Sequence, residues 1–232
     1  MNSLPAGFKA IVFGAGGALG GAFIDALRAR PGCAEVVALG RASMPAVDIE
    51  DEASLAAAAR ALHERAPFQL IVNATGALHI GNAAPEKRLA ELNAHTLARA
   101  FAINAIGPAL LIKHFAPLLP LKDRGLFASL SARVGSIGDN RKGGWYSYRA
   151  AKAAQNMLVK TAAIEISRSR PEAVLAALHP GTVRSRLSTP IIGEAPAFEP
   201  AHAAELMLTV LDSLSPEQSG GFFAYDGSRI DW

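Results

Sequence analysis

Short, continuously apolar runs alternate with longer helical patterns along almost the whole chain. The apolar runs cover residues 9–13, 35–39, 46–49, 69–73, 125–131, 173–179 and 220–225, and the helical patterns lie at about 18–30, 52–65, 89–118, 147–169 and 200–213. Because the runs are continuously apolar and do not alternate with polar residues, their strands are predicted to be covered on both faces, as in parallel sheets. Right-handed crossovers then predict an α/β, doubly wound (Rossmann) fold, with a mostly parallel seven-stranded sheet and helices on both faces.

One domain accounts for this pattern. The chain has 232 residues, 50% of them hydrophobic, which is enough for one sizeable core. No internal repeat, low-complexity tract or interdomain linker interrupts the alternation, so residues 1–232 are predicted to form a single domain. The longest irregular stretch late in the chain, about 181–199, is predicted to be a substrate lid.

The composition argues against several classes of protein. Cys33 is the only cysteine, so no internal disulfide is possible and a reducing, intracellular setting is expected. The N-terminus has no signal-peptide pattern, and no apolar run approaches the roughly 20 residues that cross a bilayer, so we expect a soluble, cytoplasmic protein. Lys and Arg are spread along a chain of net charge +3, and the six histidines show no paired ligand spacing. Nucleic-acid binding and a metal site are therefore not expected.

A glycine-rich segment, FGAGGALGGAF at residues 13–23, follows the first predicted strand directly. A turn that directs a helix N-terminus at a pyrophosphate needs glycine for tight backbone angles and for close approach of amide groups to phosphate. The segment joins a predicted strand to a predicted helix, which is the context of a dinucleotide-binding loop. Its candidate cofactor-binding residues are Gly14, Gly16, Gly17, Leu19 and Gly20.

The second predicted strand ends in ALGR, with Gly40 followed by Arg41. Enzymes that use NAD usually place Asp or Glu at this point to hold the ribose hydroxyls, and that carboxylate would repel the additional phosphate of NADP. A guanidinium can instead make bidentate hydrogen bonds to a phosphate. Arg41 therefore predicts NADP(H) as the cofactor.

The stretch YSYRAAK, residues 146–152, places two tyrosines ahead of a lysine. Residues four apart share a helix face and residues six apart do not, since each residue advances about 100°. Tyr148 is therefore the predicted partner of Lys152, and Tyr146 is turned away from it. A nearby ammonium stabilises a phenolate, so Lys152 is expected to lower the pKa of Tyr148 and make it an acid/base.

These motifs, taken in order with four others, resemble the short-chain dehydrogenase/reductase superfamily. The further segments are Asp48–Ile49, VNATG at 72–76, INAIG at 103–107 and HPGTV at 179–183. The resemblance implies that Asp48 and Ile49 contact the adenine, that Asn73, Ala74 and Thr75 lie at the cofactor, and that Asn104 holds a relay water for Lys152. It also places Pro180, Gly181, Thr182 and Val183 at the nicotinamide, with Lys152 on the ribose. The segments GGFFAYDGSRIDW and VGSIGDNRKGGWYSYRAAK further resemble the C-factor-like and sniffer-like branch of carbonyl reductases.

The catalytic serine of that superfamily has no clear counterpart. Alignment on Gly135 puts Ala132 where the serine usually stands. Ser136, in the loop beyond the strand, is the preferred substitute because successive strand side chains point to opposite faces and Ser131 should face away. Ser131, or the absence of any serine, remains the alternative.

The sequence thus predicts an NADP(H)-dependent oxidoreductase that interconverts a small-molecule carbonyl and an alcohol, with Tyr148 as acid/base. The resemblance implies a homodimer or homotetramer. A second hypothesis is an NADP(H)-binding sensor or signalling protein with little activity. A third concerns the substrate: the basic residues near the motifs would attract an anionic one. These residues are Arg133, Arg141, Lys142, Arg149, Arg184 and Arg186.

Overall fold

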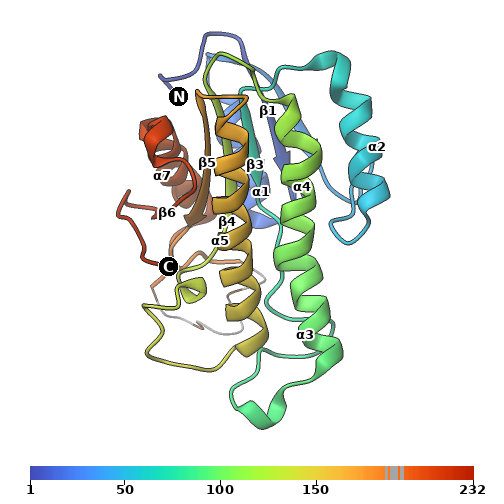
Figure 1. The fold of residues 1–232 in the computed structure, drawn as a ribbon, viewed down its shortest axis with the longest axis vertical. Coiled ribbons are helices and arrows are strands. Elements are labelled where there is room, and N and C mark those ends of the chain that lie inside the picture. Colours follow the sequence, from blue (N-terminus) through green and yellow to red (C-terminus); the bar gives the residue numbers. More distant parts are fainter. Residues whose placement is uncertain (186–187, 189–192, 194–195) are drawn as a thin grey trace.

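The computed structural model describes residues 1–185, 188, 193 and 196–232 and shows a parallel sheet between two helical layers (Figure 1). The six strands are β1 Phe8–Phe13, β2 Cys33–Leu39, β3 Leu70–Asn73, β4 Gly125–Leu130, β5 Ala173–His179 and β6 Gly221–Ala224. They pair in the order β2-β1-β3-β4-β5-β6, and every pairing is parallel. The predicted α/β, doubly wound fold is confirmed.

The helices divide between the two faces of the sheet (Figure 1). They are α1 Ala18–Arg28, α2 Glu52–Leu62, α3 Ala94–Phe101, α4 Gly107–Phe115, α5 Tyr146–Ser167 and α7 Pro200–Ser213. Residues of α2, α4 and α5 form one hydrophobic core with Ile11 and Phe13 of β1, and residues of α1 and α7 form the other with Ala10 and Val12. Alternate side chains of the same strand therefore enter different cores, which is why the strands read as continuously apolar.

The predicted strand at 46–49 is not formed, so the sheet has six strands and not seven. Val47 is buried, but its N–H donates to the Gly40 carbonyl oxygen at 3.0 Å. The segment thus folds back onto the end of β2 as a loop. Pro45 next to it has no N–H to donate to a neighbouring strand, which disfavours pairing at this point.

The long helix predicted at 89–118 is interrupted. A short 3₁₀ turn, Leu89–Glu91, precedes α3, and a π-helical segment, Ala102–Ile106, joins α3 to α4.

The run Ala94–Leu118 is long and apolar enough to cross a membrane, contrary to the expectation from sequence. Half of its most apolar window is, however, buried inside the structure. That degree of burial is typical of a core helix.

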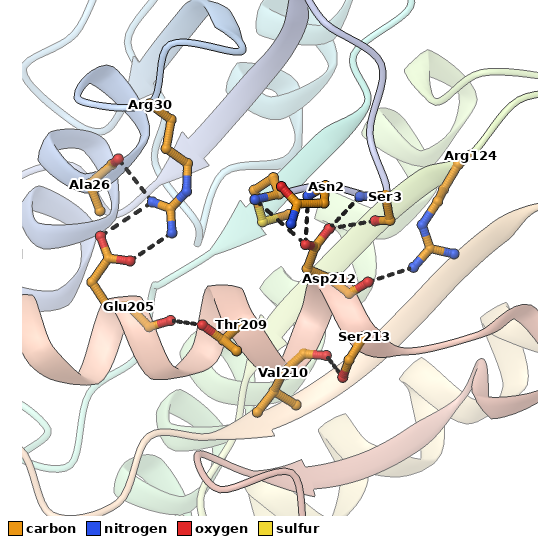
Figure 2. A network of polar contacts seen from close by, with 11 residues as sticks. Asn2, Ser3, Ala26, Arg30, Arg124, Glu205, Thr209, Val210, Asp212 and Ser213 are labelled. Atoms are coloured by element: carbon orange, nitrogen blue, oxygen red, sulfur yellow. Dashed lines mark hydrogen bonds and ion pairs between the residues drawn. The ribbon is translucent and has the colours of Figure 1, made fainter.

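Polar contacts tie α7 to elements on its side of the sheet (Figure 2). The Asp212 carboxylate accepts hydrogen bonds from the N–H groups of Asn2 (2.6 Å) and Ser3 (3.0 Å) and from the Ser3 hydroxyl (2.5 Å). Burial alone would raise the pKa of Asp212. The hydrogen bonds from Ser3 and Asn2 have the larger effect, so the pKa of Asp212 is lowered overall. Arg30, two residues beyond the end of α1, forms an ion pair with Glu205 of α7 at 2.6 Å.

The strand order creates a switch point at the carboxyl ends of β1 and β3. From β1 the chain moves outward to β2 and then returns to β3 on the opposite side of β1. The loops that follow these two strands therefore diverge. In open α/β sheets this crevice is where ligands bind.

Candidate active site

An open cavity of about 890 Å³ lies at the carboxyl ends of the strands. Its walls come from the segments after β3 and β4, from the start of α5 and from the segment after β5. Among the predicted site residues, those in its lining are Leu19, Ala74, Thr75, Tyr148, Lys152, Pro180, Gly181, Thr182 and Val183. Residues far apart in the sequence thus meet in one cleft.

The glycine loop between β1 and α1 is built by close backbone contacts. Gly14 has a φ of +81°, and a Cβ on it would lie 2.8 Å from the Ala74 carbonyl oxygen. A Cβ on Gly20 would lie 2.0 Å from the Gly14 oxygen, whereas one on Gly16 would meet nothing within 4 Å. The first turn of α1 has no acidic residue, and its N-cap, Gly17, supplies no side-chain hydrogen bond. The open space at Gly16 and the uncapped helix start fit a bound pyrophosphate.

The end of β2 adjoins this loop. A Cβ on Gly40 would lie 3.7 Å from the Ala15 nitrogen, and Arg41, the next residue, is exposed. The Ser43 hydroxyl accepts from the Gly40 N–H at 2.9 Å and donates to the Pro45 oxygen at 2.7 Å. Ser43 thus stabilises the turn through its own hydrogen bonds, and the exposed Arg41 side chain follows directly after the end of β2.

Asp48 and Ile49 lie between this loop and α4, outside the lining of the 890 Å³ cavity. The Asp48 carboxylate accepts from the Glu50 N–H at 3.0 Å. Ile49 packs against α4, because a Cβ on Gly107 would lie 2.4 Å from Ile49 Cγ1. Gly107 therefore allows the two segments to approach closely.

Tyr148 and Lys152 come together on one face of α5, as the spacing predicts. The Lys152 Nζ lies over the Tyr148 ring, 5.7 Å from its centroid. Tyr148 is half-buried and Lys152 is 2% exposed, whereas Tyr146 is 36% exposed and outside the cleft lining. Trp145, just before α5, also lines the cleft and packs edge-to-face on Tyr148.

Burial shifts the pKa of both groups toward their neutral forms. It raises the pKa of Tyr148 and lowers the pKa of Lys152 to about 7. The expectation that Lys152 lowers the pKa of Tyr148 is therefore not met in this cleft, because burial raises that pKa. The sequence gives the spacing of the pair but not its removal from water.

Asn104 and Lys152 flank Gly76. A Cβ on Gly76 would lie 3.2 Å from Asn104 Oδ1 and 3.5 Å from Lys152 Nζ. Asn104 Oδ1 accepts from the Ala77 N–H at 3.0 Å, and its Nδ2 donates to the Ala77 oxygen at 2.8 Å. Asn104 belongs to the π-helical segment. Such segments are rare and are often found at functional sites.

Asn73 shapes the chain at the end of β3 from within the core. Its Oδ1 accepts from the N–H of Thr75 at 3.0 Å and from the Thr75 hydroxyl at 2.6 Å. Its Nδ2 donates to Ser129 Oγ at 3.1 Å. The side chain is fully buried, so Asn73 positions Thr75 and does not itself line the cleft.

The structure does not bring Ser136 to the cleft. Ser136 is buried behind the turn Arg133–Gly135, and its Oγ accepts from the Asp139 N–H at 3.1 Å. Ser131 does line the cleft, next to Ala132, and its hydroxyl donates to Asn156 Oδ1 at 2.6 Å. The strand ends at Leu130, so the strict alternation used to turn Ser131 away does not extend to it.

The segment after β5 forms the opposite wall. Gly181 has a φ of +77°, and a Cβ on it would lie 2.9 Å from the rings of Phe198 and Tyr225. His179 also lines the cleft, where burial and then the charge of Arg133 lower its pKa to about 4. Of the predicted lid at 181–199, residues 186–187, 189–192 and 194–195 lie outside the described residues, and Arg186 is among them.

Gln155 is a polar residue that the sequence analysis missed. It is 1% exposed, and its Oε1 accepts from Lys152 Nζ at 2.8 Å. The available signal was its spacing, because Gln155 follows Lys152 by three residues on the same helix.

Comparisons with known proteins identify relatives over most of the chain. The family model described as enoyl-(acyl carrier protein) reductase, of the short-chain dehydrogenase/reductase group, matches residues 16–224. The 1-hydroxy-2-glutathionyl-2-methyl-3-butene dehydrogenase of Rhodococcus sp. (strain AD45) is 32% identical over 199 residues, which cover 86% of this chain and 84% of that protein. The C-signal of Myxococcus xanthus is 34% identical over 168 residues, 72% of this chain and 93% of that protein.

Solved structures share the fold at lower sequence identity. An NADPH-bound carbonyl reductase from chicken fatty liver matches with a TM-score of 0.85 at 24% identity, covering 99% of this chain and 96% of that one. The carbonyl reductase Sniffer of D. melanogaster matches with a TM-score of 0.81 at 20% identity, covering 97% and 99%.

Proposed function

Because the chain belongs to the short-chain dehydrogenase/reductase superfamily, we propose that it is an NADP(H)-dependent oxidoreductase that interconverts a carbonyl and an alcohol. One observation supports this most directly. Tyr148 and Lys152 lie together in the wall of a cleft at the carboxyl ends of the strands, 5.7 Å apart from Nζ to ring centroid. A proton donor in such a cleft is what carbonyl reduction requires in addition to a hydride.

The cofactor in this proposal is NADP(H), which supplies or accepts the hydride when bound. The glycine loop would hold the pyrophosphate at Gly16, where the space is open, and at Gly17, where α1 begins, while Gly14 and Gly20 allow the close backbone packing that shapes the loop. Arg41 would bind the additional phosphate. The NADPH-bound carbonyl reductase from chicken supports the choice of cofactor through a shared fold.

Each of four side chains at the cleft would then have a separate role in proton transfer or substrate binding. Tyr148 donates its proton to the developing alkoxide during reduction and takes it back during oxidation. Lys152, when protonated, would offset part of the effect of burial on the pKa of Tyr148, and it would bind the ribose. Asn104, which like Lys152 lies close to Gly76, would hold the relay water. Ser131 replaces Ser136 as the group that orients the substrate carbonyl, because Ser131 lines the cleft.

The decisive experiment compares the two tyrosines. NADPH consumption is measured over a panel of aldehydes and ketones for the wild type, Tyr148→Phe and the matched control Tyr146→Phe. Loss of a general acid/base typically costs about 10²- to 10⁴-fold, so Tyr148→Phe is expected to fall by at least about 10²-fold while Tyr146→Phe keeps wild-type turnover. Equal turnover in wild type and Tyr148→Phe would remove Tyr148 from the chemistry.

For the substrate, we propose an anionic compound. Among the described residues, Arg133, Arg141, Lys142 and Arg149 line the cleft together with one carboxylate, that of Asp139. The name of the Rhodococcus relative denotes a glutathionyl substrate, and a glutathione conjugate carries carboxylates. Electrostatic attraction is screened by salt, so kcat/KM for such a conjugate should fall with ionic strength, and kcat/KM for a neutral ketone should not. Equal salt responses for the two would exclude an anionic substrate.

These basic residues are not equivalent in the structure. Arg149 donates to the Gly144 oxygen at 2.9 Å and Arg133 lies 3.8 Å from Asp139, so both have contacts within the protein. Arg141 and Lys142 are exposed at the cleft. We therefore expect Lys142→Ala to raise KM for the anionic substrate with little change in kcat.

A second candidate function is NADP(H)-dependent sensing with little catalysis. The similarity to C-signal of Myxococcus xanthus supports this candidate. Tight NADPH binding, measured by quenching of intrinsic fluorescence, with no turnover of any panel member would favour it.

A further inference from the structure

Gln155 connects the amine of Lys152 to the end of the sheet through a chain of buried hydrogen bonds. Lys152 Nζ donates to the Leu130 oxygen at 3.0 Å and to Gln155 Oε1 at 2.8 Å. Gln155 Nε2 in turn donates to Ser129 Oγ at 2.8 Å and to the Leu130 oxygen at 3.0 Å. Lys152, Ser129 and Gln155 are at most 2% exposed, so water does not compete for these bonds.

The chemistry of the partners fixes the orientation of the Gln155 amide. A backbone carbonyl only accepts, so the amide atom that faces Leu130 must be the nitrogen. An ammonium only donates, so the atom that faces Lys152 must be the oxygen. The reversed amide would place a donor against Nζ and an acceptor against the Leu130 oxygen. Gln155 therefore presents a fixed acceptor to Lys152.

The chain of hydrogen bonds continues from Ser129 to the segment after β3. Ser129 Oγ also accepts from Asn73 Nδ2 at 3.1 Å, and Asn73 Oδ1 accepts from the Thr75 N–H at 3.0 Å. Thr75 and Lys152 both line the cleft. One continuous buried path thus runs from the cleft wall after β3 to the amine on α5.

We propose that Gln155 is a positioning residue that holds the Lys152 ammonium toward Gly76 and Tyr148, where the amine serves the proton chemistry. This proposal rests on the proposed function and adds a residue to it. A hydrogen bond to the charged form favours that form, so the fixed oxygen of Gln155 offsets part of the desolvation of the amine. Without this acceptor, Lys152 would more often be neutral at working pH, and only the Leu130 oxygen would direct its amine.

Of the groups that face Lys152, few besides Gln155 could stabilise its charged form. Tyr148 is the titratable side chain over which Nζ lies. From β4 the Leu130 carbonyl faces the amine, and from the π-helical segment Asn104 Oδ1 also lies near Gly76. Apart from Tyr148, these neighbours are uncharged, and burial is the cause of the lowered pKa of Lys152.

The test titrates the amine directly in the cofactor-free protein, by NMR of ¹⁵N-lysine-labelled samples. The Lys152 signal is assigned by its loss in Lys152→Met. Gln155→Met keeps the length of the side chain but removes both polar atoms, and hydrogen bonds to charged groups are strong enough to move a pKa by about one unit or more. We expect the Lys152 midpoint to fall by at least that much in Gln155→Met and to rise in Gln155→Glu.

The matched control is Val159→Ala, one helical turn beyond Gln155 on the same helix and equally buried at 1% exposure. It should lower Tm but leave the Lys152 midpoint unchanged. A wild-type midpoint in Gln155→Met would overturn the proposal. If Gln155→Met does not fold, Gln155→Glu decides, and an unchanged midpoint in that variant has the same meaning.

Activity gives a second readout if the enzyme is active. Gln155→Met should lower kcat by about tenfold or more above neutral pH, with KM for a neutral ketone unchanged, and a kcat–pH profile that matches wild type would contradict the proposal. If the wild type turns over no panel member, the proposed function fails, but the NMR titration still decides the role of Gln155.

Discussion

Replacing Lys152 by methionine is expected to stabilise the cofactor-free protein near neutral pH. The pKa of Lys152 falls from 10.5 to about 7 on burial, and each pKa unit corresponds to about 1.4 kcal/mol. Keeping the amine in the folded protein at pH 7 therefore costs about 4 to 5 kcal/mol. Methionine has no charge to desolvate, but it leaves Gln155 Oε1 without its donor, at a cost of about 1 to 3 kcal/mol. A net gain of about 2 kcal/mol remains.

The pH dependence of this gain identifies its cause. Between pH 7 and 10.5 the unfolded chain binds more protons at Lys152 than the folded chain does, so the stability of the wild type rises with pH in that range. Below pH 7 the lysine is charged in both states and the penalty is constant. The advantage of Lys152→Met should therefore shrink by about 2 kcal/mol from pH 7 to pH 9.

Urea unfolding of both proteins at pH 7, 8 and 9 measures this difference, with equal m-values as the condition for comparing them. Other titrating groups are present in both proteins and cancel. His179, with a pKa of about 4, has finished titrating below this range, and Tyr148, whose pKa is raised, titrates above it. Parallel stability curves across the range would refute the reasoning, because they would mean that Lys152 is not held away from water.

Three further predictions concern other parts of the molecule. Gly20→Ala should abolish NADPH binding, measured by fluorescence titration, because its Cβ would lie 2.0 Å from the Gly14 oxygen; wild-type affinity would contradict this account of the loop. Asp212→Ala should lower the free energy of unfolding by about 1 to 3 kcal/mol. Because the pKa of Asp212 is lowered, the difference between wild type and variant should diminish as the pH falls through that pKa. A difference that does not change with pH would show that the hydrogen bonds from Ser3 contribute little. We propose a homodimer through α4 and α5, where Ile164 is 52% exposed, so Ile164→Glu should give monomers in light scattering, and an unchanged mass would exclude this face.

The fold was predictable because its signals are local. The central strands were apolar runs with both faces covered, and the glycine loop lay between a strand and a helix. The segment 46–49 misled because Val47 is buried without being in a strand. Its burial comes from a turn back to Gly40. The periodicity of the sequence does not distinguish a residue buried in a strand from one buried in such a turn.

The site was predictable only where helix geometry decides it. Spacing alone selected Tyr148 over Tyr146 as the partner of Lys152. Ser136 was misplaced because a turn of three residues, Arg133–Gly135, carries it behind the cleft. The pKa shifts depend on burial by segments distant in the sequence, so the raised pKa of Tyr148 could not be read from its neighbours along the chain.

The π-helical segment Ala102–Ile106 is expected to lower stability while serving the proposed activity. Deleting one residue there would restore a regular helix with better hydrogen bonds. It would also turn everything on one side of the deletion by about 100° relative to the other side, so Asn104 could no longer face Ala77 while α4 kept its packing. In a library of such deletions, selection for heat resistance should therefore enrich variants that lack one residue of the segment. Selection for turnover should enrich variants that keep all five residues.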